Sequence, residues 1–257
     1  MKKALLAVGG VLLLIVLIAA VVIVPAFMGL KPFVDGTKYA DGTATLVADG
    51  YVSLMVLDGD PGSVALIDCG NDPNGAAILA ALKARSLGPE AVKAIFLTHG
   101  HQDHVAACHL FTGAQVYAFG PDVKLAAGEA RAKGPLPKML DMPKERAIKV
   151  TQELTDGQTV DVGALQVKAY LLPGHTGGSA AYLSKGVLYL GDSAAGKSDG
   201  KGIKPAPWLF SDDPALNVAE LKKLHGKLKA DRAEVKTLVF SHAGSLDGVD
   251  LLLTADQ

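Results

Sequence analysis

Three histidines and an aspartate lie within six consecutive residues of this chain, His99–His104, which read HGHQDH. Neutral imidazole and carboxylate groups are the ligands that zinc and similar divalent metals take in proteins. The residues directly before them, Val92–Leu97, are apolar except for Lys93 and include the β-branched Val92 and Ile95, and they predict a buried strand. The polar side chains would therefore lie at the end of a strand, where α/β proteins commonly bind ligands. We interpret the segment as part of a metal site, with a solvated polar loop as the alternative.

Three more predicted strand ends carry side chains of the same kind. His175 lies in a Gly/Pro turn between two apolar runs, and Asp192 and His242 each follow a short apolar strand. Glycines beside each of them let backbone and ligand approach closely. The other two of the 7 histidines, His109 and His225, lie on predicted helices and are interpreted as surface or packing residues.

The order of these motifs resembles that of the metallo-β-lactamase superfamily of metallo-hydrolases. The motifs IDCG, HGHQDH, PGHTGGS, LGDS and SHAG follow one another in the family's order, and the resemblance covers the chain from about residue 43 to the C-terminus. The resemblance implies an α+β fold, a four-layer αββα sandwich, with a dinuclear metal site between the sheet edges.

The resemblance also implies a role for each ligand. The first metal would be bound by His99, His101 and His175. The second would be bound by Asp103, His104 and His242, with Asp192 bridging the two. Asp68, in IDCG, would accept a hydrogen bond from a ligand histidine and fix its tautomer. Two zinc ions per chain are expected, with iron or manganese as alternative metals.

A dinuclear site of this kind predicts a hydrolase. Two metals about 3.5–4 Å apart share a hydroxide, because they lower the pKa of water from about 15.7 towards neutrality. That hydroxide is the nucleophile, so neither a serine nor a cysteine nucleophile is needed. Asp103 is the candidate proton carrier to the leaving group. The expected substrate is a small carbonyl compound: an ester, a thioester or a lactone.

Three alternatives remain open at this point: two other hydrolytic substrates and one different reaction. Asp192 stands where many zinc β-lactamases of this family carry cysteine or serine. Among the possible substrates, we therefore rank a β-lactam second and a phosphoester third. A mononuclear-iron dioxygenase that oxidises persulfides is the rival from a different reaction class, since two histidines and one aspartate suffice for iron.

The N-terminus predicts a membrane anchor. No charged residue occurs from Ala4 to Leu30, directly after Lys2 and Lys3, and about 20 apolar residues span a bilayer. We expect residues 1–30 to form an uncleaved signal anchor in the inner membrane, with secretion after signal cleavage as the alternative. The two lysines would remain cytoplasmic, so the catalytic domain would be periplasmic.

The rest of the chain predicts one domain. Residues 31–42 are interpreted as a linker, and 43–257 as the catalytic domain. The net charge is −1 with both signs dispersed, which argues against nucleic acid as a partner and favours a small-molecule substrate. Cys69 and Cys108 are interpreted as two separate buried thiols, in preference to a disulfide or metal ligands.

Local signals add two helices and two loops. We expect helices over 73–87, with Asp72 as N-cap, and over 214–229, capped by Asp213. The loop 133–146 is a candidate lid, and we take Met139 there and Trp208 in a later loop as candidate walls of a substrate pocket. Packing against the core is the alternative for both side chains.

Overall fold

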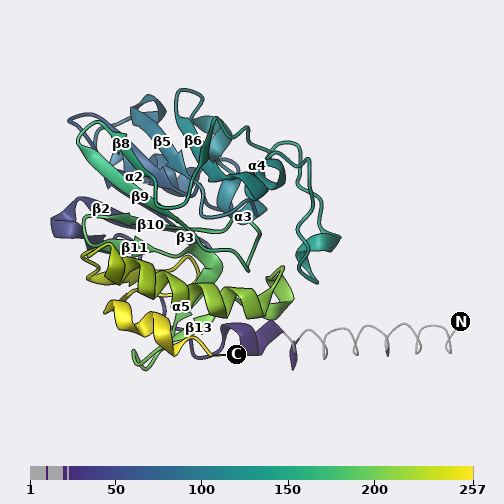
Figure 1. Ribbon diagram of the computed structural model, residues 1–257. Coiled ribbons are helices and arrows are strands. Elements are labelled where there is room, and N and C mark those ends of the chain that lie inside the picture. Colours follow the sequence, from purple (N-terminus) through teal and green to yellow (C-terminus); the bar gives the residue numbers. More distant parts are fainter. Residues whose placement is uncertain (1–9, 11–19, 22, 257) are drawn as a thin grey trace, which may run out of the picture.

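Two β-sheets packed face to face form the centre of the molecule (Figure 1). The computed structural model describes residues 10, 20–21 and 23–256. The first sheet consists of β1 (Lys38–Tyr39), β2 (Ala44–Asp49), β3 (Val52–Asp58), β4 (Val64–Ile67), β5 (Val92–Phe96), β6 (Gln115–Phe119) and β7 (Gln152–Leu154), in that order. Its first half is antiparallel, and β4 to β7 are parallel.

The second sheet has the order β15-β14-β11-β10-β9-β8. Its strands are β8 (Thr159–Val162), β9 (Leu165–Leu171), β10 (Ala180–Ser184), β11 (Val187–Tyr189), β14 (Thr237–Val239) and β15 (Leu246–Asp247). Only β11 and β14 are parallel neighbours here. A separate hairpin consists of β12 (Ala194–Gly196) and β13 (Ile203–Pro205).

Helices cover the outer faces of both sheets, so the layers follow one another as αββα. The helices are α2 (Ala76–Lys83), α3 (Gln102–Val105), α4 (Gly120–Ala126) and α5 (Pro214–Ala230). Ile78 and Leu82 of α2 pack on the first sheet, and Leu221 and Leu224 of α5 pack on the second. A third cluster, drawn from both sheets, fills the space between them. The four-layer sandwich predicted from the sequence is confirmed.

One of the two predicted helices is shorter than expected. α2 begins at Ala76 instead of Pro73, because Gly75 has a left-handed φ of 62° and no helix can run through it. Asp72 still caps the turn, since its carboxylate accepts the N–H groups of Asn74 and Ala76. α5 begins at Pro214 as predicted, and the Asp213 carboxylate accepts the Leu216 N–H at 2.9 Å.

The prediction of two separate thiols was wrong, because Cys69 and Cys108 form a disulfide with their Cα atoms 5.3 Å apart. The expected long helix after His104 ends at Val105, and the chain turns back so that Cys108 meets the loop that follows β4. Backbone hydrogen bonds join the same two segments, from Cys69 N to His104 O and from Ala106 N to Gly70 O. The disulfide therefore fastens the HGHQDH segment to the end of β4.

Most of the predicted membrane anchor lies outside the described residues. Among the residues that are described, no helix is both long and apolar enough to cross a bilayer. The predicted linker 31–42 is attached to the sandwich: Lys31 N donates to Gly196 O, Gly244 N donates to Lys31 O, and Phe33 packs on the central core. The sequence predicted a linker here and gave no sign of these backbone contacts.

Candidate metal centre

The loops that carry the predicted ligands come from both sheets and meet in one place. HGHQDH follows β5 of the first sheet, while Asp192 and His242 follow the parallel strands β11 and β14 of the second. His175 lies in the turn between β9 and β10. Since each sheet contributes only part of the set, packing of the two sheets assembles the site.

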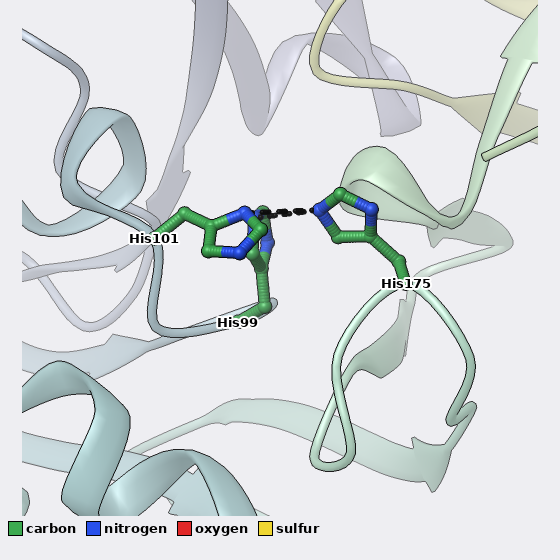
Figure 2. A group of neighbouring side chains, drawn as sticks. All are labelled: His99, His101 and His175. Carbon is green, nitrogen blue, oxygen red and sulfur yellow. Dashed lines mark hydrogen bonds between the residues drawn. The ribbon is translucent and has the colours of Figure 1, made fainter. Parts of the chain in front are cut away.

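Three histidine rings converge at the first half of the site (Figure 2). His99 Nε2 lies 3.0 Å from His101 Nδ1, and His175 Nε2 lies 3.2 Å and 3.1 Å from these two atoms. Nitrogens held about 2.0–2.1 Å from a tetrahedral zinc ion would lie about 3.3 Å from one another. The triangle is therefore within a few tenths of an ångström of the size that a zinc ion requires.

Asp103, His104 and His242 form the second half, with ligand atoms within 4.8 Å of one another. Asp103 Oδ2 lies 3.9 Å from Nε2 of His104 and 3.9 Å from Nε2 of His242. The first triad contains imidazoles only, whereas this one includes a carboxylate.

Asp192 lies between the two halves. Its Oδ2 is 3.1 Å from His242 Nε2 and 3.6 Å from His175 Nε2, and its Oδ1 is 3.3 Å from His104 Nε2. One carboxylate thus reaches members of both triads, as the bridging position requires.

The donor set fits divalent metal ions. His104 Nε2 and Asp192 Oδ1 are buried and have no hydrogen-bond partner within the described part of the chain. A buried polar atom left unpaired costs about 1–3 kcal/mol, and a cation between the two would satisfy both. Imidazoles with carboxylates, and no thiolate, are ligands that suit zinc and iron.

The electrostatics differ between the two halves. Burial and the neighbouring histidines hold the pKa of His99 well below its usual value, and burial lowers the pKa of His175 to about 3. Both rings are therefore neutral and have a lone pair for a metal. Burial also disfavours the charged form of His104, but Asp192, Asp103 and Asp68 outweigh it and raise the pKa of His104 well above its usual value. The second half is thus the place where extra positive charge is stabilised.

Asp68 holds His104 from behind the site. Its Oδ2 accepts a hydrogen bond from His104 Nδ1 at 2.8 Å and from the Thr98 hydroxyl at 2.7 Å, and its Oδ1 accepts the Thr98 N–H at 2.7 Å. Because Nδ1 of His104 is engaged in this way, Nε2 is the atom that faces the site. The predicted contact between Asp68 and a ligand histidine is present.

A second buried carboxylate, Asp122 of α4, holds two ligand loops together. It accepts hydrogen bonds from Gly100 N at 2.7 Å, from Gly178 N at 2.8 Å and from the Thr176 hydroxyl at 2.8 Å. Gly100 lies between His99 and His101, two of the predicted ligands, and Thr176 follows His175. The relative position of the three rings in Figure 2 therefore depends on this side chain.

A cavity of about 500 Å³ opens over the site. Its floor includes His101, Asp103, His175, Asp192 and His242, and most of its wall area is apolar. Much of the wall comes from three segments far apart in sequence, residues 26–30, the loop 130–146 and residues 194–210, and Tyr51, Asn71 and Leu125 also line the cavity. Its volume lies within the ~300–1,000 Å³ of typical small-molecule sites.

Comparison with known proteins identifies the family. A sequence model described as the metallo-beta-lactamase superfamily matches residues 47–242. The chain belongs to this superfamily. Its members are generally metal-dependent hydrolases, which agrees with the predicted reaction class.

Solved structures of the superfamily share this fold. The metallo-beta-lactamase SMB-1, solved with mercaptoacetic acid, is 25% identical over 82% of this chain and 80% of its own, with a TM-score of 0.60. BJP-1, a subclass B3 metallo-beta-lactamase of Bradyrhizobium japonicum, is 20% identical over 83% of this chain and 79% of its own, with a TM-score of 0.57. A metallo-beta-lactamase family protein of Thermus thermophilus is 23% identical over 80% and 75%, with a TM-score of 0.58.

Two predicted wall residues of this superfamily member do not line the cavity. Met139 is 75% exposed and Trp208 is 57% exposed, and both side chains lie outside the lining. Their neighbours Leu140, Met142 and Phe210 line it instead. The loops were predicted correctly, but packing decides which side chain of each loop turns inward. His109 and His225 also lie apart from the ligand clusters, as expected.

Phe27, Tyr51 and Arg146 are among the lining residues that the sequence analysis missed. Phe27 was assigned to the membrane segment, and Tyr51 resembled any strand residue. Tyr51 stacks on the His242 ring at 5.8 Å, and its carbonyl accepts a hydrogen bond from His242 Nδ1 at 2.9 Å. Arg146 lines the cavity from the end of the candidate lid. Of these three, only Arg146 could have been found from the sequence, because it is a cation in the loop 133–146, the candidate lid.

Proposed function

We propose that this chain is a dinuclear zinc hydrolase that acts on a small carbonyl substrate: an ester, a thioester or a lactone. The observation that supports it most is the pair of ligand triads joined by Asp192, whose two oxygens reach members of both. A complete second triad favours two metal ions over the single iron of a dioxygenase.

The residues of the chain have separate tasks in this proposal. When bound, two zinc ions would lower the pKa of a water between them and polarise the carbonyl oxygen of the substrate. His99, His101 and His175 would hold the first ion, and Asp103, His104 and His242 the second. Asp192 would keep the two ions at a fixed separation.

Asp103 would carry the proton to the leaving group. Its side chain is 22% exposed and lines the cavity, whereas the ring of His104 beside it is buried. A carboxylate at the boundary between metal and substrate can accept a proton from water and pass it on within hydrogen-bond reach.

Hydrolysis of a β-lactam is the second candidate. It is favoured by the structural likeness to SMB-1 and BJP-1, which are named as metallo-beta-lactamases. A β-lactam is itself a strained carbonyl compound, so the same ligand set would serve, and the substrate panel decides between the two.

We also propose that residues 1–30 anchor the protein in the inner membrane with its catalytic domain in the periplasm. The uncharged run after Lys2 and Lys3 supports the anchor. The disulfide between Cys69 and Cys108 supports an oxidising compartment, because such bonds are rare in the cytosol.

The test is metal content and hydrolysis of the full-length protein, for the wild type and for Asp192→Ala. We expect close to two zinc ions per wild-type chain, together with turnover of an ester, thioester or lactone. Asp192→Ala should lose at least one ion and most of the turnover, on the order of a hundredfold or more. His225→Gln is the control, since His225 Nε2 forms a hydrogen bond with the exposed Asp250 and lies apart from the ligand clusters.

Three results would contradict the proposal in different ways. About one iron ion per chain with oxygen uptake on persulfides would favour the dioxygenase. Turnover of β-lactams alone would favour the second candidate. Full activity of Asp192→Ala would remove the bridging role of that carboxylate.

A further inference from the structure

The cavity over the metal centre has an apolar wall that the N-terminal segment supplies. Ala26, Phe27 and Leu30 all line it, as do Leu140 and Met142 of the lid loop. The Phe27 ring lies 6.0 Å from the Phe210 ring and 6.2 Å from the ring of His242, edge to face in both cases. One apolar side chain of the N-terminal segment thus contacts a predicted metal ligand.

This wall is held in place by hydrogen bonds to the ligand-bearing loops. Lys31 N donates to Gly196 O, four residues after Asp192, and Gly244 N, two residues after His242, donates to Lys31 O. Ser198 N also donates to Gly29 O at 2.8 Å. The approach at Gly244 is so close that a Cβ there would overlap the carbonyl of Pro32. The segment is therefore a fixed part of the site.

Two of the three cations around the cavity are already engaged. Lys204 Nζ donates to the Met28 carbonyl at 2.6 Å and so fixes the end of the N-terminal helical turn. Arg131 pairs with Asp141. Arg146 is the remaining cation, with one hydrogen bond to Asn71 at 3.3 Å. Asn71 Oδ1 also accepts the Tyr51 hydroxyl, so Gln102 and Arg146 are the polar side chains that a substrate would meet in the described lining away from the metal ligands, and the rest of the wall is mostly apolar.

The mouth of the cavity is also bordered by exposed apolar side chains. Phe27 and Leu140 line the cavity and are still 43% and 52% exposed. Met28 and Met139, each next to one of them in sequence, are 62% and 75% exposed. An apolar path therefore leads from the surface to the metal ligands.

We propose that the cavity binds the acyl chain of an amphipathic ester, thioester or lactone, with Phe27 and the lid residues Leu140 and Met142 as its walls. The inference rests on the proposed function and narrows its substrate class. The carbonyl lies at the metal centre, and the methylene groups extend along the apolar wall. Each buried methylene adds at most about fourfold to binding, because burying it contributes about 0.8 kcal/mol.

The test uses the full-length, zinc-loaded protein in lipid nanodiscs and p-nitrophenyl esters of acetate, butyrate and octanoate. We expect kcat/KM to rise at least about tenfold from the acetyl to the octanoyl ester. Phe27→Ala should lower the octanoyl-to-acetyl ratio about fivefold, and Phe27→Leu should restore most of it. Val34→Ala is the matched control, because Val34 is exposed and apolar but does not line the cavity.

A wild-type ratio near one, or an equal loss for both esters in Phe27→Ala, would overturn the inference while leaving the proposed hydrolase intact. Calorimetry with octanoate and acetate tests binding without turnover. If no ester is hydrolysed but octanoate binds, and binds more weakly to Phe27→Ala, the proposed function fails and the acyl site stands. If octanoate binds no better than acetate, the acyl site fails.

Discussion

Asp68 has a backbone φ of 62° and lies buried behind His104. Asparagine tolerates the left-handed conformation as well as aspartate does, so Asp68→Asn changes the charge without straining the backbone. We expect zinc affinity at the second half of the site to fall about 10–100-fold, because the carboxylate no longer orients and polarises the ring. A zinc titration against a chromophoric chelator measures this. Unchanged affinity would mean that Thr98 and the backbone alone hold the ring.

The seven ligand-type residues were accessible to sequence reasoning because their chemistry is local. An HGHQDH segment at a strand end has few other uses, and each remaining ligand has a glycine within two residues. The wall residues were not accessible in this way. Trp208 and Phe210 lie in one short helical turn, yet only Phe210 lines the cavity. That choice depends on contact with Phe27, some 180 residues away, which periodicity does not reveal.

At the scale of elements, the disulfide connects the loop after β4 to the turn after α3, across 39 residues. In the chain-entropy account, closing a loop of this length stabilises the folded state by about 4 kcal/mol. We therefore expect Cys69→Ser, or reduction, to lower the free energy of unfolding by up to that amount, as urea unfolding with and without reductant would show. Because the chain has 2 cysteines, reductant should have no effect on Cys69→Ser. A further shift there would point to a cause other than this disulfide.

The helix α4 presents Asp122 to both ligand loops, and burial raises the pKa of Asp122 to about 6. The folded state therefore holds this proton more tightly than the unfolded state, whose pKa is near 3.8. The resulting stabilisation is fully present below pH ~4 and is lost as the pH rises through about 6, a change of about 3 kcal/mol. Asp122→Asn cannot titrate and should lack this component.

Urea unfolding of metal-free wild type and Asp122→Asn between pH 4 and pH 7 measures the difference in slope. Metal-free protein is used because protonation of the metal ligands would otherwise release metal and change the stability with pH. The variant is expected to be less stable overall, since its amide offers one acceptor where the carboxylate binds Gly100, Gly178 and Thr176. Only the slope of the unfolding free energy against pH tests whether Asp122 titrates as described. Parallel curves for the wild type and the variant would refute this.

For the molecule as a whole, the four layers were implied by the resemblance of the motifs and their order to the metallo-β-lactamase superfamily. The attachment of the N-terminal segment did not follow. An uncharged run long enough to cross a bilayer has the same sequence pattern whether or not its last residues also pack on the protein. Backbone bonds such as the one from Lys31 to Gly196 carry no signature in the side chains.

Two truncated chains test this attachment, one beginning at Ala20 and the other at Val34. The first keeps Phe27, Leu30 and Lys31. The second loses the three backbone hydrogen bonds that residues 29–31 make with Gly196, Ser198 and Gly244. At about 1 kcal/mol for each bond, we expect the shorter chain to be less stable by about 3 kcal/mol. It should also retain less zinc, because those bonds hold the loops of Asp192 and His242. Thermal unfolding with and without chelator compares the two chains. Equal stability and equal zinc content would show that the fold and the metal centre do not need the N-terminal segment. Residues 26–31 would then contribute to substrate binding only.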